Sequence, residues 1–304
     1  MNLISGLVSI AIPAYKDKYL KEAIESALNQ DYKNIELIIV NDDSPYPIDE
    51  IVKSYYDSRI IYYRNNENIG RKSVAYNWNQ CLSYAKGEFF VLLCDDDILD
   101  PLFVSELVGL AKKYPQCSVF HATRQVCKDG VVLPWGNNQW SIYEDYDSFI
   151  ENKMNGKRMH TITEFLYRTD FIKSIGYAVF PVGYFSDDVS ILMFAKHSKC
   201  IVSSNKCLAT FRVSSVHISS DNTLIISKVV AHKKYIKWLK HREEFCKYIS
   251  SQKRVYNDTI WKYFYQSNSK QKMLLLFYIP LSYANIKKLF TYYKSRLITR
   301  FSNL

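Results

Sequence analysis

The sequence predicts an α/β fold, a mixed but mainly parallel sheet flanked by helices and followed by a helical extension. Over residues 5–115, apolar β-rich runs alternate with segments of helical apolar spacing, a pattern typical of right-handed βαβ units. The runs are apolar almost without interruption, as expected for strands that are covered on both faces. With 304 residues, 48% of them hydrophobic, the chain can bury a large core.

Each element of the first half follows from these periodicities. The expected strands are residues 8–14, 35–40, 59–64 and 88–94. The expected helices, with apolar residues three and four apart, are residues 19–30, 48–56, 72–85 and 100–114. The N-terminus has an apolar run but no basic residues before it, so it is interpreted as a first strand rather than a signal peptide.

The pattern changes after residue 117. Residues 118–135 are expected to form a strand, a turn at Lys128-Asp129-Gly130 and a return strand. A polar, aromatic region follows (135–160), then a helix near 163–175, a loop leading into a helix (182–199) and a strand (201–213). The rest of the chain is predicted to be helical.

Seven cysteines are scattered along the chain and never spaced as CxxC. An odd number without metal-ligand spacing argues against a disulfide framework or a structural zinc site. The expectation is reduced thiols in a cytosol.

The net charge of +10 is concentrated at the C-terminus, where residues 225–304 hold 17 Lys and Arg but three acidic residues. Such a tail predicts a polyanionic partner, and a solvated basic helix face is the alternative. No nucleic-acid-reading motif is present, so a membrane surface is favoured over nucleic acid. The apolar window 273–284 is too short to span a bilayer and contains Pro280, so it would lie on a membrane. A homo-oligomer through the tail's aromatic face stays open.

Polar side chains follow three of the predicted strands, in the positions of Tyr15, Asp42 and Asp95–Asp97. Ligands of open parallel sheets bind beyond the carboxyl ends of the strands. Oxygen-only clusters suit Mg²⁺ or Mn²⁺ completed by substrate phosphates, whereas a tyrosine and a carboxylate suit a nucleobase. The alternatives are a helix cap for one aspartate and ordinary packing for the tyrosine.

Three segments together, VSIAIPAYK, IELIIVNDDS and the run from NENIGRK to CDDDILDP, resemble the nucleotide-sugar-binding half of family 2 glycosyltransferases with the GT-A fold. The resemblance is strong over residues 5–112, thinner to about 220 and absent beyond. It implies a nucleotide-sugar-binding half (1–115), an acceptor-binding and catalytic half (116–222) and a basic aromatic extension (223–304).

The resemblance implies a role for each matching residue. Pro13, Tyr15 and Asp42 would hold the base. Asn68, Gly70, Arg71 and Lys72 would lie near the nucleotide, with Arg71 or Lys72 replacing a family arginine that is absent from Asn77-Trp78-Asn79. Trp135–Trp140 and Arg158–Thr161 fall where acceptors bind.

In the acidic motif, Cys94 stands where the family has its first aspartate. The expectation is Asp97 as ligand of Mn²⁺ or Mg²⁺ with Asp95 assisting, and Asp96 nearer the donor. Arg212 and His217 would reach the diphosphate or the metal.

The pair Asp187-Asp188 matches the family's catalytic pair, whose second member is generally the base, and helix capping is a compatible reading. The expected function is inverting transfer of a sugar, from UDP above all, to a glycan or lipid-linked glycan in bacterial surface-polysaccharide assembly. The expected place is the cytoplasm, at the inner membrane face. A catalytically silent scaffold is the alternative, because Cys94 and Trp78 depart from the family pattern.

Overall fold

The structure is a computed structural model that describes residues 3–133, 140–213 and 221–301. The chain divides into two compact units, residues 1–220 and 221–304, and each is described by itself.

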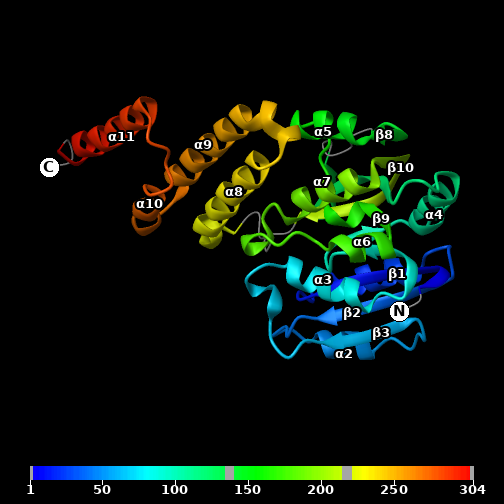
Figure 1. The fold of residues 1–304 in the computed structure, drawn as a ribbon. Coiled ribbons are helices and arrows are strands. Elements are labelled where there is room, and N and C mark those ends of the chain that lie inside the picture. Colours follow the sequence, from blue (N-terminus) through cyan, green and yellow to red (C-terminus); the bar gives the residue numbers. More distant parts are fainter. Residues whose placement is uncertain (1–2, 134–139, 214–220, 302–304) are drawn as a thin grey trace. The chain divides into compact units, whose positions relative to one another are not determined.

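The described strands of the N-terminal unit form one ten-stranded sheet (Figure 1). They are β1 (Ile4–Ala14), β2 (Ile35–Asn41), β3 (Ile60–Arg64), β4 (Gly87–Leu92), β5 (Ile98–Leu99), β6 (Val119–Lys128), β7 (Val131–Leu133), β8 (Tyr143–Asp145), β9 (Phe165–Arg168) and β10 (Cys200–Val213). Their order is β3-β2-β1-β4-β9-β6-β10-β5, with β7 paired to β6 and β8 paired to β10. Strands β3, β2, β1 and β4 are parallel, β9 runs antiparallel to both β4 and β6, and β10 runs parallel to β6.

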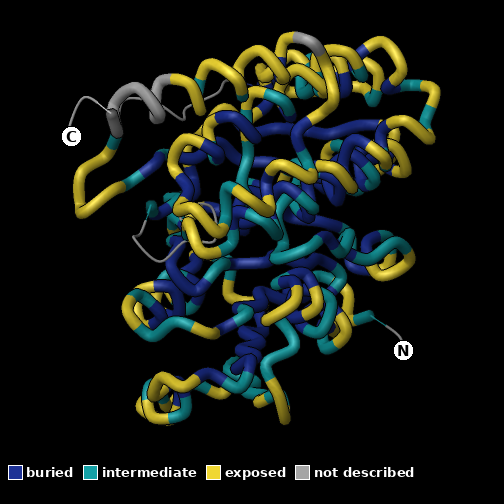
Figure 2. The backbone as a smooth tube through the Cα atoms, turned by 90° about the vertical axis from the view of Figure 1, so that its left-hand side faces the viewer, coloured by how far each residue is buried: buried dark blue, intermediate teal, exposed yellow. Residues whose placement is uncertain are grey.

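Helices connect these strands and bury their apolar faces. They are α1 (Leu20–Leu28), α2 (Ile48–Lys53), α3 (Ala75–Tyr84), α4 (Phe103–Lys113), α5 (Tyr146–Met154), α6 (Thr169–Ile175) and α7 (Ser186–Ser198), with the 3₁₀ turns η1 (Ile69–Arg71), η2 (Ile162–Glu164) and η3 (Pro181–Gly183). Central strand β1 contributes Val8, Ile10 and Ile12 to the core, all fully buried. The central strands are dark blue in Figure 2, as expected for a sheet covered on both faces.

The predicted turn after residue 128 is a β-hairpin between β6 and β7. Asp129 and Gly130 both have positive φ, +50° and +80°, as a two-residue type I′ hairpin turn requires. Glycine and aspartate tolerate this left-handed backbone better than other residues, so the local sequence determines the turn.

The helix predicted near 163–175 is wrong over its first half. Residues 165–168 form strand β9, in which Tyr167 pairs with Phe90 of β4 and with Val119 of β6. The segment is short and almost wholly apolar, so its periodicity does not separate a buried strand from a buried helix. Pairing with β4 and β6 makes this segment a strand. Helix α6 begins only at Thr169.

The expectation that all the cysteines are reduced is also wrong for one pair, because a disulfide joins Cys117 and Cys200 across 83 residues. Cys117 precedes β6 and Cys200 begins β10, and these two strands are parallel neighbours. Their starts therefore lie side by side, with the two Cα atoms 5.7 Å apart. Sequence spacing carries no sign of this pairing, since the topology creates it.

The second unit is helical and has a core of its own. Its elements are η4 (Asn222–Leu224), α8 (Ile225–Lys240), η5 (Glu243–Tyr248), α9 (Ile249–Gln266), α10 (Ser269–Leu275) and α11 (Tyr283–Phe301). Ile236, Ile260, Trp261 and Phe264 are buried in this core. Among the described helices of the chain, none combines the length and the apolar character that a membrane crossing needs.

Candidate active site

The carboxyl ends of the parallel strands bring the predicted polar residues to one edge of the sheet. Strand β1 lies between β2 and β4, so the segments after all three strands are neighbours. Tyr15 follows β1, Asp42 follows β2, and Asp95–Asp97 follow β4. This is the edge at which open α/β sheets bind ligands.

Asp42 organises the loop that follows β3. Its Oδ1 accepts hydrogen bonds from Asn65 Nδ2 (2.7 Å) and from the Ile69 amide (3.0 Å), and its Oδ2 accepts from the Gly70 amide (2.7 Å). A Cβ on residue 70 would lie 2.5 Å from Asp42 Oδ2, so only glycine allows this approach. The carboxylate, 3% exposed, thus fixes η1 at the sheet edge.

The residues around Asp42 are partly available to a ligand. The Tyr15 ring is 37% exposed and meets Tyr46 edge-on, with ring centroids 6.4 Å apart. Arg71 and Lys72, in and after η1, are exposed, and Asn68 caps η1 with an extended backbone. Pro13 pairs with Val40 inside the sheet, so its role is to shape the end of β1.

The first two aspartates of the acidic motif share one lysine. Lys16 Nζ lies 2.7 Å from Asp96 Oδ2 and 3.8 Å from Asp95 Oδ1. Asp95 Oδ2 also accepts from the amides of Tyr15 (2.9 Å) and Lys16 (2.7 Å). Burial raises the pKa of Asp95, although Lys16 opposes that shift. Burial alone would lower the pKa of Lys16, but Asp95 and Asp96 raise it, so the ammonium stays charged.

Asp97 differs from the other two because it contacts distant elements of the fold rather than Lys16. Its Oδ2 accepts from Thr163 Oγ1 (2.6 Å) and its Oδ1 accepts from the Arg212 amide (3.0 Å). The residue is 1% exposed, and burial, with the neighbouring Asp96 charge, raises the pKa of its carboxyl group. Asp97 therefore ties the acidic turn to η2 and to β10.

The Arg212 side chain lies against α1 rather than the acidic motif. Its Nη2 donates to Glu22 Oε2 (2.6 Å), and its guanidinium carbon is 3.9 Å from the centroid of the Tyr19 ring. His217, expected to assist at the metal, lies outside the described residues, as do residues 135–139 of the aromatic segment. Trp140 is buried and stacks on His121, so it belongs to the core.

The backbone before α7 adopts rare conformations that aim the second acidic pair. Val182 and Phe185 have φ of +52° and +72°, left-handed values that are costly for β-branched and aromatic residues. The Val182 amide donates to the Lys72 carbonyl (2.8 Å), which ties this segment to the loop after η1. Such strain is often stored at functional sites, where the surrounding structure holds it in place.

Asp187 and Asp188 open α7, and a lysine holds the second of them. Lys153 Nζ of α5 donates to Asp188 Oδ1 at 2.5 Å and also contacts His160 Nδ1 at 3.1 Å. The Asp188 side chain is 31% exposed, whereas the Lys153 side chain is 12% exposed. Burial and then the Lys153 charge lower the pKa of His160 to about 3, so its ring is neutral. Burial and the Asp188 charge raise the pKa of Asp187.

One short segment contacts both acidic centres. Thr163 binds Asp97, and His160, three residues earlier, contacts the lysine that holds Asp188. Three residues span at most about 11 Å even when fully extended. The segment 160–163 thus links the acidic motif after β4, through Thr163, to the lysine that holds Asp188, through His160.

Sequence reasoning missed Lys16, Lys153 and Thr163. Lys16 directly follows Tyr15, so its place after the first strand was a usable signal. Lys153 and Thr163 carry no such signal, because they meet the aspartates through contacts 35 and 66 residues apart in the chain.

The chain matches a known protein family. The profile described as Glycosyl transferase family 2 matches residues 9–176, more than half of the chain. The chain belongs to glycosyl transferase family 2. The family match and the names of the relatives support a transferase enzyme over a silent scaffold.

Curated relatives match about a third of the chain. An uncharacterized glycosyltransferase of Rickettsia typhi is 40% identical over 113 residues, 37% of this chain and 34% of the relative. The Escherichia coli enzyme named UDP-Glc:alpha-D-GlcNAc-diphosphoundecaprenol beta-1,3-glucosyltransferase WfaP is 44% identical over 92 residues, 30% of this chain and 36% of that protein. These alignments span about a third of the length of the relatives.

Solved structures confirm the GT-A fold. Residues 1–349 of TarS from S. aureus, in complex with UDP-GlcNAc, match with a TM-score of 0.61 at 18% identity, covering 86% of this chain and 73% of that one. A mannosyltransferase of Pyrobaculum calidifontis in complex with GDP-Man and Mn²⁺ matches with a TM-score of 0.55 at 14% identity, covering 84% and 71%.

Proposed function

We propose that this glycosyltransferase moves a sugar from a nucleoside diphosphate, UDP above all, to a hydroxyl group of a glycan or lipid-linked glycan, with inversion. The observation that carries the proposal is the joining of two acidic centres by residues 160–164. One centre lies beside the nucleotide-binding edge of the sheet, and the other presents a partly exposed carboxylate at the start of α7.

The donor half binds the nucleotide. The exposed Tyr15 ring stacks on the base, and Asp42, which fixes η1, places the Gly70 backbone beside it. Arg71 and Lys72 are exposed next to this turn and face the diphosphate. The names of two similar proteins, which bind UDP-GlcNAc or use UDP-Glc, favour UDP as the nucleotide.

A divalent cation, Mn²⁺ or Mg²⁺, fits the first two aspartates. The Lys16 ammonium lies between Asp95 and Asp96, where the metal cation would bind, and shows that both carboxylates converge on a cation. Such cations need only one or two carboxylates when phosphates and water complete their shell. We therefore assign Asp96 and Asp95, which already face the Lys16 cation, as ligands, and give Asp97, which ties the acidic turn to η2 and β10, a supporting role. When bound, the metal would stabilise negative charge on the leaving diphosphate.

Asp188 acts as the general base. Its carboxylate takes the proton of the acceptor hydroxyl while the hydroxyl oxygen bonds to the anomeric carbon and the bond to the diphosphate breaks. One displacement of this kind inverts the configuration and needs no covalent intermediate. Lys153 orients the carboxylate, and the neutral His160 receives a hydrogen bond from Lys153 on Nδ1, which leaves the proton on Nε2. That Nε2 is buried and has no hydrogen-bond partner among the described residues.

The acceptor and the pathway are inferred from the relatives. WfaP is named for a diphosphoundecaprenol-linked acceptor. GgaB from Bacillus subtilis, which is named a minor teichoic acid biosynthesis protein, is 40% identical to this chain over one segment. We infer a lipid-linked saccharide acceptor in the assembly of a bacterial surface polysaccharide such as O-antigen or capsule, at the inner face of the cytoplasmic membrane.

The test is a donor screen followed by product analysis. Purified enzyme is incubated with individual nucleotide sugars, with Mn²⁺ or with EDTA, and with or without a lipid-linked acceptor extract. Release of nucleoside diphosphate that requires both one donor and the extract supports transfer. NMR of the fresh product must show the anomeric configuration opposite to that of the donor. A retained configuration would contradict the base role of Asp188.

A further inference from the structure

The second unit has an apolar surface that nothing in the described chain covers. The connection between α10 and α11 is anchored by Ile279, which is 7% exposed, but Phe277 and Leu281 on either side are 80% and 96% exposed. Large apolar side chains that lie together in water are unusual on a protein surface, and they mark sites that bind a partner or a membrane.

Helix α11 carries further exposed apolar side chains. Ile286, Phe290 and Tyr293 are spaced four and three residues apart, so they form one row along the helix, and they are 56%, 70% and 46% exposed. A different row of the same helix, with Leu289 and Tyr292, packs on the core of the unit. The helix is therefore apolar on two sides, of which the described fold covers one. We call Phe277, Leu281, Ile286, Phe290 and Tyr293 the apolar row.

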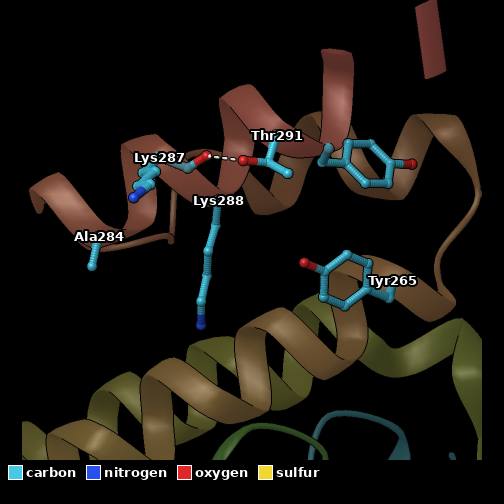
Figure 3. A pocket seen from close by; sticks show the side chains of 6 residues that line it. Tyr265, Ala284, Lys287, Lys288 and Thr291 are labelled. Carbon is cyan, nitrogen blue, oxygen red and sulfur yellow. Dashed lines mark hydrogen bonds between the residues drawn. The ribbon is translucent and has the colours of Figure 1, made fainter. Parts of the chain in front are cut away.

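Basic side chains border the apolar row. Lys287 and Lys294 are exposed, and on α11 they are seven residues apart beside Ile286 and Tyr293. On another side of the helix, Lys288 lies over the Trp261 ring and lines a hollow of about 520 Å³ between α9 and α11, together with Lys287 and Tyr265 (Figure 3). Residues 221–304 as a whole hold 17 Lys and Arg against four Asp and Glu.

We propose that the apolar row inserts into the surface of a bilayer of anionic lipids, with Lys287 and Lys294 at the level of the phosphates. Exposed apolar residues flanked by lysines are the arrangement that binds membrane interfaces, because long basic side chains keep their charge in the headgroup layer. A second copy of the same unit is a poorer partner, since its strong positive charge would repel this one. Nucleic acid offers no apolar layer for Leu281 and Ile286. The proposal is independent of the donor and base assignments.

The test is sedimentation of the full chain with vesicles. We expect binding to vesicles that contain phosphatidylglycerol and little binding to pure phosphatidylcholine. Each basic residue near an anionic surface contributes about fivefold to the affinity, so Lys287→Gln with Lys294→Gln should weaken binding at least about tenfold. Phe277→Ser with Leu281→Ser should weaken it at least about tenfold as well, because two fully exposed apolar side chains lose their burial.

Matched controls use exposed residues of the N-terminal unit. Val131→Ser with Val132→Ser, and separately Lys112→Gln with Lys113→Gln, should leave vesicle binding unchanged. Binding of the wild-type chain should also fall steeply with added salt, a result that needs no variant.

Three outcomes would overturn the proposal. The wild-type chain fails to bind anionic vesicles, or the two apolar substitutions leave its binding unchanged, or they change only its oligomeric state in sedimentation velocity. The last result would make the apolar row an interface between copies. Nucleotide-sugar turnover with a soluble acceptor should be the same in all these variants, so failure here is distinguishable from failure of the proposed reaction.

Discussion

Replacing Lys16 with methionine should make the acidic motif a tighter metal site and a less stable one in the absence of metal. The Lys16 ammonium donates to Asp96 at 2.7 Å and lies 3.8 Å from Asp95. A divalent cation that takes both carboxylates must displace this ammonium. Methionine keeps most of the side-chain volume but removes the competing charge.

The magnitude follows from these contacts. A hydrogen bond between charged groups contributes about 1.5–3 kcal/mol, and in the wild-type enzyme the incoming cation must give up that stabilisation. Since about 1.4 kcal/mol is a factor of ten, Mn²⁺ should bind Lys16→Met about 10- to 100-fold more tightly. Loss of one member of a buried ion pair costs about 3–5 kcal/mol. Because the Lys16 side chain is 28% exposed, solvent screening reduces the expected cost to about 1–3 kcal/mol.

The assay is titration of Mn²⁺ by electron paramagnetic resonance, in which the free ion is counted, together with unfolding in EDTA and in Mn²⁺. Lys18→Met is the matched control, because Lys18 is exposed two residues further along and lies over the Tyr19 ring. The reasoning is refuted if Lys16→Met binds Mn²⁺ no more tightly than wild type. If neither protein binds Mn²⁺ even with UDP, the metal assignment itself fails.

Three further substitutions probe the rest of the site. Lys153→Met should lower kcat about 10- to 100-fold with the donor KM unchanged, because the Asp188 carboxylate loses the partner that orients it. Lys153→Arg should restore part of kcat. A change confined to KM would contradict this role. Gly70→Ala should weaken UDP binding measured by calorimetry about tenfold, because its Cβ would displace the Asp42 carboxylate, whereas Gly109→Ala in α4, with nothing near its Cβ, should have no effect. The pKa of His160 is about 3 in the folded chain, against an ordinary 6.5. Between pH 6.5 and pH 3 the unfolded chain therefore binds a proton at this residue that the folded chain does not bind. Acidification through this range favours unfolding. Going from about pH 7.5 to 5.5 should cost about 1.4 kcal/mol through this residue, a loss that His160→Gln removes in chemical denaturation and His197→Gln, exposed on α7, does not.

The main strands and helices of residues 1–115 could be predicted from the sequence because their apolar periodicity is regular. Strand β9 could not, since four apolar residues take their conformation from the slot between β4 and β6. The same limit applies to Cys117 and Cys200, which only the parallel alignment of β6 and β10 brings together.

The site shows the same division. Tyr15, Asp42 and the acidic motif were predictable because the ends of parallel strands share an edge of the sheet. The separate contacts of Asp95, Asp96 and Asp97 were not, because they depend on which oxygens Lys16, Thr163 and the Arg212 amide occupy. Adjacent residues in the chain thus acquire different roles from distant partners.

The central claim is that Asp188 takes the proton of the acceptor hydroxyl. The most direct test is the turnover rate of Asp188→Asn at saturating donor and acceptor. Asparagine keeps the shape and the contact to Lys153 but cannot accept the proton. We predict a rate at least about 100-fold lower than that of wild type, with UDP affinity within about twofold. Turnover close to the wild-type rate would contradict the account.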